Sequence, residues 1–190
     1  MSAQPDQLIL LATPHPPGQL SDCIMLFQEP VVIIKANISN TKGSYDFWVI
    51  KLSATGELLW ERSFGGSGIE IAYDIAKTDD GGYVVTGNTF STDKDISMNH
   101  GESDVWLIKI DDNGKLLWEK TFGGSQFDAA QGVSTSNDGG FVITGNSKSI
   151  AGDVSENQGE NDIWVLKTDS DANLIWQGSF GGSNLDYGAL

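Results

Sequence analysis

Two long polar segments carry closely spaced carboxylates that could bind a cation. Ca²⁺ takes about six to eight oxygen ligands, and neighbouring carboxylates on a flexible loop can supply several of them. Asp93 and Asp95 have an alternating spacing, but the glycine and glutamate that complete an EF-hand do not follow. The candidate Ca²⁺ ligands are Asp93, Asp95, Glu102, Asp104, Asp153, Glu160 and Asp162.

These carboxylates have a second interpretation, as a solvated polar loop followed by an aspartate that caps the next strand. Asp104 and Asp162 stand at equivalent positions, immediately before an apolar run. Because charged runs are more often solvated surface than binding site, the sequence favours this interpretation over a cation site. No cofactor other than Ca²⁺ is indicated.

The sequence shows no pattern of a catalytic site. His15 and His100 are unrelated in position, and the single cysteine, Cys23, lies in an apolar run. A serine recurs in every G-G-S segment, as Ser67, Ser125 and Ser183, which favours a turn over a nucleophile. Because function must be argued from a site, we expect no enzymatic activity in this chain.

The charge of the chain limits its partners. Its 190 residues carry 26 acidic and 11 basic side chains, a formal net charge of −15. Phosphate recognition depends on Lys and Arg, so nucleic acid and anionic membrane surfaces are not expected partners. The longest apolar run near the start, residues 8–12, is too short to insert into a membrane, and no basic residue precedes it as in a signal peptide.

A repeat of 58 residues determines the expected fold. The strand DFWVIKL at 46–52 recurs as DVWLIKI at 104–110 and as DIWVLKT at 162–168. The alignment of 46–90 with 104–148 has 21 identities in 45 positions without a gap. Fixed-period similarity of this kind is typical of stacked repeat architectures.

Each unit is predicted to contain four short antiparallel strands. In the best-defined unit these are 72–78, 83–89, 104–110 and 116–122, separated by Gly- and Asp-rich turns and by the polar loop 90–103. A weaker first unit has expected strands at 21–26 and 31–34. We therefore expect an all-β, partial propeller-like array of about three blades in residues 20–190. Its blades are at about 20–64, 72–122 and 130–180, a fourth starts at 184–190, and residues 1–19 are unassigned and expected to be disordered.

Propellers close with about four to eight blades, so three blades leave exposed faces. The expected consequence is that the chain is a fragment of a longer protein, with self-association as the alternative way to cover those faces.

The combined motifs resemble those of β-propeller repeats in secreted and cell-surface bacterial and archaeal proteins, often cargo of type IX secretion. The shared motifs are the D-x-W strand, G-x-L-x-W, F-G-G-S and D-G-G-Y-x-V-T-G, and they cover residues 20–190. The resemblance implies an extracellular or cell-surface location. The G-E-L-L-W segment at 56–60 and its copy at 114–118 also look like the docking turns of quinoprotein propellers, whose Trp locks one blade to the next.

The recurring tryptophans and glycines are expected to be structural. Trp48, Trp106 and Trp164 alternate with aliphatic residues inside strands, which predicts burial and argues against a sugar-stacking role. In the third docking turn Ala172 replaces the glycine, which predicts strain or another turn type. The structural set is Trp48, Trp60, Trp106, Trp118, Trp164, Trp176, Gly65, Gly66, Gly81, Gly82, Gly123, Gly124, Gly139, Gly140, Gly181 and Gly182.

Three functions remain open from the sequence. The first is a non-catalytic scaffold whose variable loops bind a protein or a glycan. The second is the accessory propeller of an extracellular enzyme, and the third is a Ca²⁺-stabilised surface-layer module. The difference between loops 90–103 and 148–161, set in matching frames, favours the first.

Overall fold

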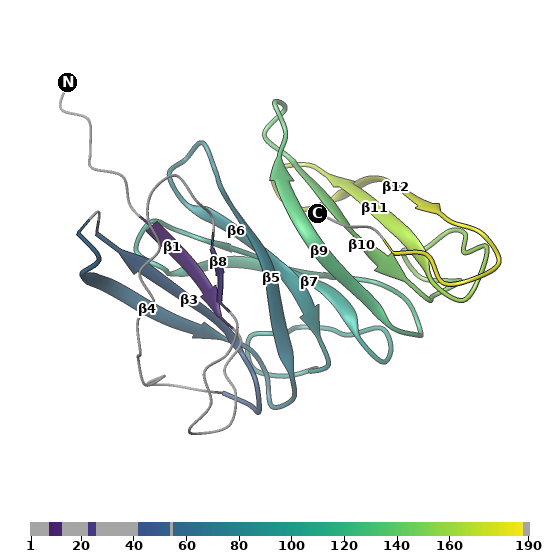
Figure 1. Ribbon diagram of the computed structural model, residues 1–190, viewed down its shortest axis with the longest axis horizontal. Helices are drawn as coiled ribbons and strands as arrows, with labels where there is room; N and C mark the ends of the chain where they lie inside the picture. Colours follow the sequence, from purple (N-terminus) through teal and green to yellow (C-terminus); the bar gives the residue numbers. More distant parts are fainter. Residues whose placement is uncertain (1–7, 13–22, 26–41, 54, 188–190) are drawn as a thin grey trace.

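The computed structural model describes residues 8–12, 23–25, 42–53 and 55–187. Every regular element in these residues is a β-strand, and the strands form three four-stranded antiparallel sheets. The sheets stand in a row in chain order, from purple and blue through teal to yellow in Figure 1. The predicted all-β class with four-stranded antiparallel units is confirmed.

The central sheet follows the sequence prediction closely. It contains β5 (Glu70–Lys77), β6 (Tyr83–Thr89), β7 (Asp104–Ile110) and β8 (Leu116–Phe122), paired in chain order. Three of these strands have the predicted bounds, and the first begins two residues before the predicted 72. The C-terminal sheet repeats the arrangement with its own four strands, β9 (Asp128–Thr135), β10 (Phe141–Ser147), β11 (Asp162–Thr168) and β12 (Leu174–Phe180).

The N-terminal sheet is built differently. Its strands are β1 (Leu8–Ala12), β2 (Cys23–Met25), β3 (Phe47–Leu52) and β4 (Leu58–Phe64), in the order β2-β1-β3-β4. β1 lies within the segment that was expected to be disordered, and it pairs antiparallel with β3 at the place that β6 has beside β7. β2 falls in the predicted strand 21–26, whereas the predicted strand 31–34 lies outside the described residues.

Adjacent sheets are joined by the same local contact. After β4 the chain passes through the F-G-G-S corner and forms a parallel bridge between Ile69 and Tyr45, and Phe127 bridges Ser103 in the same way. A third bridge joins Leu185 to Asn161 after β12. The entry to each successive unit is therefore fixed by the unit before it.

Apolar side chains from both neighbours fill the space between adjacent sheets. One cluster combines Phe47 and Val49 of the N-terminal sheet with Trp106 and Ile108 of the central sheet. A second cluster joins the central and C-terminal sheets in the same way, through Leu107 and Trp164 among others. β3 and β7 are buried on both faces, which explains their continuous apolar sequence.

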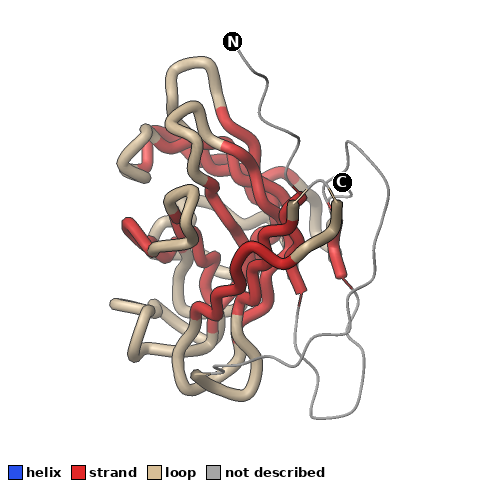
Figure 2. Tube along the Cα trace, turned by 90° about the vertical axis from the view of Figure 1, so that its left-hand side faces the viewer, coloured by secondary structure: helices blue, strands red, loops and turns tan. Residues whose placement is uncertain are grey.

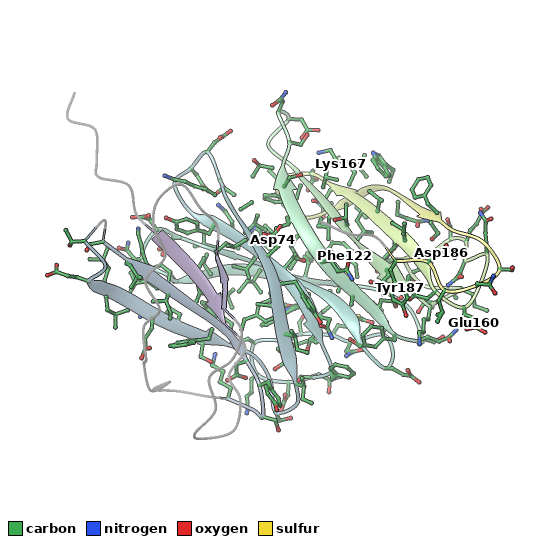
Figure 3. All side chains as sticks on the ribbon, in the orientation of Figure 1. Asp74, Phe122, Glu160, Lys167, Asp186 and Tyr187 are labelled. Carbon is green, nitrogen blue, oxygen red and sulfur yellow. The ribbon has the colours of Figure 1, made fainter. Side chains whose placement is uncertain are left out.

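Loops and turns gather at both ends of the strands (Figure 2). The hairpin turns that join first to second strands and third to fourth strands lie at one end, which we call the turn end. The loops 90–103 and 148–161 and the F-G-G-S corners lie at the other, which we call the loop end. Figure 3 labels Lys167 near the turn end and Glu160 at the loop end of the C-terminal sheet.

Candidate functional site

The loop end holds most of the candidate ligand residues, and its two long loops are fastened to the preceding sheet by the same contacts. Oδ2 of Asp95 accepts a hydrogen bond of 3.0 Å from the backbone N–H of Gly65. The equivalent Asp153 accepts one of 3.1 Å from Gly123. Because carboxylates bind backbone N–H groups strongly, each loop carries its own attachment to the neighbouring unit.

A serine and a buried aliphatic residue complete each attachment. Ser91 accepts a hydrogen bond from the backbone N–H of Gly68, and the equivalent Ser149 accepts one from Gln126. Ile96 and Val154, also equivalent, are 2% and 1% exposed. Burial of an aliphatic side chain in the middle of a polar loop holds the loop against the sheets.

An asparagine ties each loop to the strand that precedes it. The side-chain amide of Asn99 donates to the backbone carbonyl of Thr89 at 3.1 Å, and Asn157 donates to Ser147 at 3.0 Å. The two loops thus share one backbone frame.

Most of the predicted Ca²⁺ ligands have protein partners or are exposed. Asp93 accepts a hydrogen bond from the backbone N–H of Ser67, and Asp95 and Asp153 hold the corner glycines. Glu102 and Glu160 are exposed, whereas Asp104 and Asp162 are buried at the starts of β7 and β11. Within the described part of the chain, no three Asp, Glu, His or Cys side chains converge in a way that could hold a metal ion.

The buried aspartates instead form acidic pairs across the corner glycines. A Cβ placed on Gly123 would lie 2.5 Å from Oδ1 of Asp104 and 2.8 Å from Oδ2 of Asp128. Gly65 has the same relation to Asp46 and Glu70, and Gly181 to Asp162 and Asp186. Oδ1 of Asp46, Asp104 and Asp162 has no hydrogen-bond partner among the described residues. Glycine is required at the corner because a side chain there would displace both carboxylates.

Burial raises the pKa values of Asp104 and Asp128, the acidic pair beside Gly123. Desolvation raises the pKa of Asp104, against hydrogen bonds from His100 that lower it, and the nearby Asp128 charge raises it further. Desolvation also raises the pKa of Asp128, against hydrogen bonds from Ser147 and Ser149. The ordinary carboxyl value is 3.8, so these two groups hold their protons more tightly than exposed aspartates.

The contact between His100 and Asp104 breaks the repeat, as does the ion pair between Lys42 and Asp95. Nδ1 of His100 lies 2.6 Å from Oδ2 of Asp104, and the His100 backbone N–H also donates to that oxygen. The equivalent Gln158 makes only the backbone contact with Asp162 among its described hydrogen bonds. His15 lies outside the described residues, and Cys23 lies in β2.

Sequence reasoning did not find the acidic pairs or the His100 contact. Glu70, Asp128 and Asp186 recur at the 58-residue spacing, so the signal for the second acid of each pair was present. The His100 contact has no such signal, because it occurs in one unit.

The exposed positions of the two loops differ. Phe90 and Met98 of the first loop are 43% and 54% exposed, and Lys148 and Glu156 stand at the same positions of the second. The Phe90 ring lies 6.1 Å from that of Phe127, which makes a small aromatic surface at the loop end. Loops with one frame and different surfaces can present different contacts from a fixed scaffold.

The turn end uses its acids differently. Nζ of Lys109 lies 2.6 Å from Oδ1 of Asp80, and Lys167 is 2.7 Å from Asp138. Hydrogen bonds from these lysines are the first cause that lowers the pKa of each aspartate to about 2. Both aspartates also accept a backbone N–H of their own turns, from Gly82 and Gly140.

Asp112 differs from Asp80 and Asp138. Asp111 is the residue that caps this turn, because its Oδ1 accepts the backbone N–H groups of Asn113 and Lys115. Asp112 pairs with Lys51 of the N-terminal sheet, so it links two units.

The tryptophans lie in two sets. Trp48, Trp106 and Trp164 are 7%, 0% and 1% exposed, as their alternation with aliphatic residues predicts. Trp60 and Trp118 pack against the clusters they share with the following sheet, and Trp60 Nε1 donates to the backbone carbonyl of Asp112. Trp176 is 48% exposed.

The docking turn with Ala172 is of the same type as those with glycine. Ala172 has a φ of 59°, beside 81° and 76° for Gly56 and Gly114, and its N–H donates to the backbone carbonyl of Asp169 at 3.2 Å. The third turn therefore holds an alanine in the left-handed region, which costs about 1 kcal/mol relative to glycine.

No protein-family model matches this chain, and a search of the curated proteins gives no match. Among the described residues no helix is long and apolar enough to span a membrane. The geometry defines a class, an all-β repeat protein of stacked four-stranded antiparallel sheets.

Proposed function

We propose that the chain is a non-catalytic propeller-type scaffold of a secreted or cell-surface protein, and that its loop end binds a protein or a glycan. The observation that carries this proposal is the pair of loops 90–103 and 148–161. Asp95, Ser91 and Ile96 and their equivalents make the same hydrogen bonds and the same buried contact in both loops, while the exposed side chains differ.

The propeller assignment is supported by the way the sheets follow one another. Three sheets of equal strand number pack face to face in chain order, and each enters through the same parallel bridge. A propeller is built from about four to eight such four-stranded sheets, and a row of three is consistent with part of one. The motif resemblance supports the extracellular location.

The experiment is a screen followed by a loop exchange. The purified chain is tested on a glycan array and against a panel of extracellular proteins. Five positions of the second loop then take the residues of the first, as Lys148→Phe, Ile150→Thr, Ala151→Asp, Glu156→Met and Gln158→His. The anchors stay, so the thermal midpoint should remain and the binding profile should change.

The matched control is the anchor change Asp153→Asn, which should loosen the loop without altering its exposed surface. If the exchanged chain keeps its fold and binds the same ligands as before, recognition does not depend on these loops. Absence of binding in the screen contradicts the proposal in the same way.

A second candidate, the Ca²⁺-stabilised surface-layer module, is favoured by one observation. Oδ1 of Asp104 is buried beside Asp128 without a hydrogen-bond donor, and a cation could occupy such a position. Thermal melts with Ca²⁺ and with a chelator separate the two candidates.

A further inference from the structure

The C-terminal sheet exposes a face that the other two sheets bury. The last residue of the fourth strand is phenylalanine in each unit, and the exposed fractions are 5% for Phe64, 4% for Phe122 and 56% for Phe180. The sequences at these positions are equivalent, so the difference comes from what stands next to each sheet. Phe64 and Phe122 belong to the clusters shared with the following sheet.

The docking tryptophans show the same difference. Trp60 reaches the turn of the following sheet and donates to the Asp112 carbonyl at 3.1 Å, and the Trp118 ring lies 5.9 Å from that of Phe141. Trp176 is 48% exposed, and Ile175 beside it is 56% exposed.

The chain after β12 is already placed as the entry to another unit. Leu185 bridges Asn161 as Phe127 bridges Ser103, and the backbone N–H of Asp186 donates to the Asn161 carbonyl at 2.7 Å. Oδ2 of Asp186 accepts the N–H of Gly182, as Oδ2 of Asp128 accepts that of Gly124. Figure 3 labels Asp186 and Tyr187 beside the C-terminal sheet.

A second copy of the chain does not offer the complementary surface in its described residues. The face that receives a preceding sheet carries the buried tryptophan of the third strand, and in the N-terminal sheet Trp48 and Ile50 are 7% and 3% exposed. That face is therefore already covered.

We propose that the exposed face of β12 binds one further four-stranded unit of the same repeat, continuous with Leu185–Tyr187. The two internal interfaces define what this unit must present. It needs a turn carbonyl for the Trp176 indole, as Asp112 provides for Trp60, and an aromatic ring beside Trp176, as Phe141 provides for Trp118. The inference rests on the repeated interface and not on what the loops bind.

The test is an extended chain in which a second copy of residues 130–187 follows Tyr187, in register with the 58-residue repeat. Phe180→Ala is introduced into both the original and the extended chain, with Phe122→Ala as the matched control. Phe122→Ala should lower the thermal midpoint of both by about 10 °C, because it opens a cavity in a packed interface. Phe180→Ala should leave the original chain unchanged and lower the extended chain by a similar amount.

Hydrogen exchange supplies the second readout. In the extended chain the amides of β12 and of the added unit should gain protection together, and Phe180→Ala should remove that gain. An added unit without protected amides overturns the proposal, as does an extended chain whose midpoint is indifferent to Phe180→Ala. If the original chain sediments as a dimer that Phe180→Ala dissociates, the occupant is a second copy and the proposal is wrong.

Discussion

The two ends of the strands contain aspartates in opposite electrostatic situations. At the turn end, the side chain of Asp80 is 62% exposed and pairs with Lys109, which is 6% exposed. At the loop end, Asp104 and Asp128 are both fully buried beside one glycine, and His100 is the basic side chain that contacts Asp104. The pKa of Asp80 is lowered to about 2, whereas the pKa values of Asp104 and Asp128 are raised.

The two ends show how a chain with 26 acidic and 11 basic residues distributes its charge. The turn end is neutralised by a lysine that recurs in every third strand as Lys51, Lys109 and Lys167. The loop end holds its acids mainly with backbone N–H and hydroxyl donors, and its basic partners, Lys42 for Asp95 and His100 for Asp104, do not recur from unit to unit. Asp80 and Asp138 stabilise the turn end by charge pairing, whereas Asp104 and Asp128 shape a loop-end corner at an electrostatic cost.

The largest effect should come from a methyl group added at the loop end. Gly123→Ala places a Cβ within 2.8 Å of two buried carboxylates, whereas Gly139→Ala at the turn end meets nothing within 4 Å and only keeps a φ of 83°. We expect Gly123→Ala to lower the free energy of unfolding by about 3 kcal/mol and Gly139→Ala by about 1 kcal/mol. Urea unfolding of both variants measures this. Equal losses would mean that the corner acids are not packed on the glycine.

Removal of one turn-end lysine should have the next largest effect. Lys109→Met keeps the buried stem and removes the charge, so the pKa of Asp80 should rise from about 2 toward its ordinary 3.8. We expect a loss of about 1 kcal/mol, since the aspartate is exposed. The internal control is Asp138, whose lysine is intact and whose pKa should stay at about 2. An Asp80 pKa that does not move would exclude the ion pair.

The pH dependence of stability should have opposite signs at the two ends. Asp80 and Asp138 have folded pKa values of about 2, below 3.8, so their contribution is present above pH 4 and is lost as the pH falls from about 4 to about 2. Asp104 and Asp128 have raised folded pKa values, so acidification through those values stabilises the folded state until 3.8 is reached.

Two variants separate these contributions. The double variant Asp80→Asn and Asp138→Asn should reduce the loss of stability between pH 4 and 2. Asp128→Asn should reduce the gain that precedes it, because burial still raises the pKa of Asp104. Urea unfolding across the pH range measures both profiles. Profiles of the same sign would contradict the distinction between the ends.

The smallest effect should come from Ca²⁺ removal. Asp93, Asp95 and Asp153 already accept backbone N–H groups, so we expect the thermal midpoint to be the same with Ca²⁺ and with a chelator. A midpoint that rises with Ca²⁺ concentration, and that Asp104→Asn makes insensitive, would favour the Ca²⁺-stabilised module instead.

The sequence predicts the architecture well because the same strand and turn patterns recur in every unit, so that each copy supports the assignment of the others. The bounds of β6, β7 and β8 follow from alternation and turn glycines that recur in register. The sequence does not predict β1, because Leu8–Ala12 shares no motif with β6 and β10, the second strands of the other two sheets. Its pairing with β3 shows that it occupies the equivalent place.

The candidate sites were harder to predict, for a physical reason. Asp95 and Asp104 are candidate ligands of one cation because they are close in sequence. In the structure, Asp95 accepts the N–H of Gly65 in the preceding corner, whereas Asp104 is buried beside Asp128. These contacts arise only when the sheets pack together. The lysine at position 109 recurs in an otherwise apolar strand, which is evident from the sequence. Its partner Asp80 lies in the turn between β5 and β6, so the ion pair is evident only in the structure.

The most direct test of the distinction between the ends is an NMR titration of the side-chain carboxyl groups of Asp80, Asp138, Asp104 and Asp128. The structure predicts the first two to titrate at about 2 and the other two above 3.8. Four titrations clustered near 3.8 would contradict it, because the turn-end ion pairs and the buried loop-end acids would then both be absent in solution.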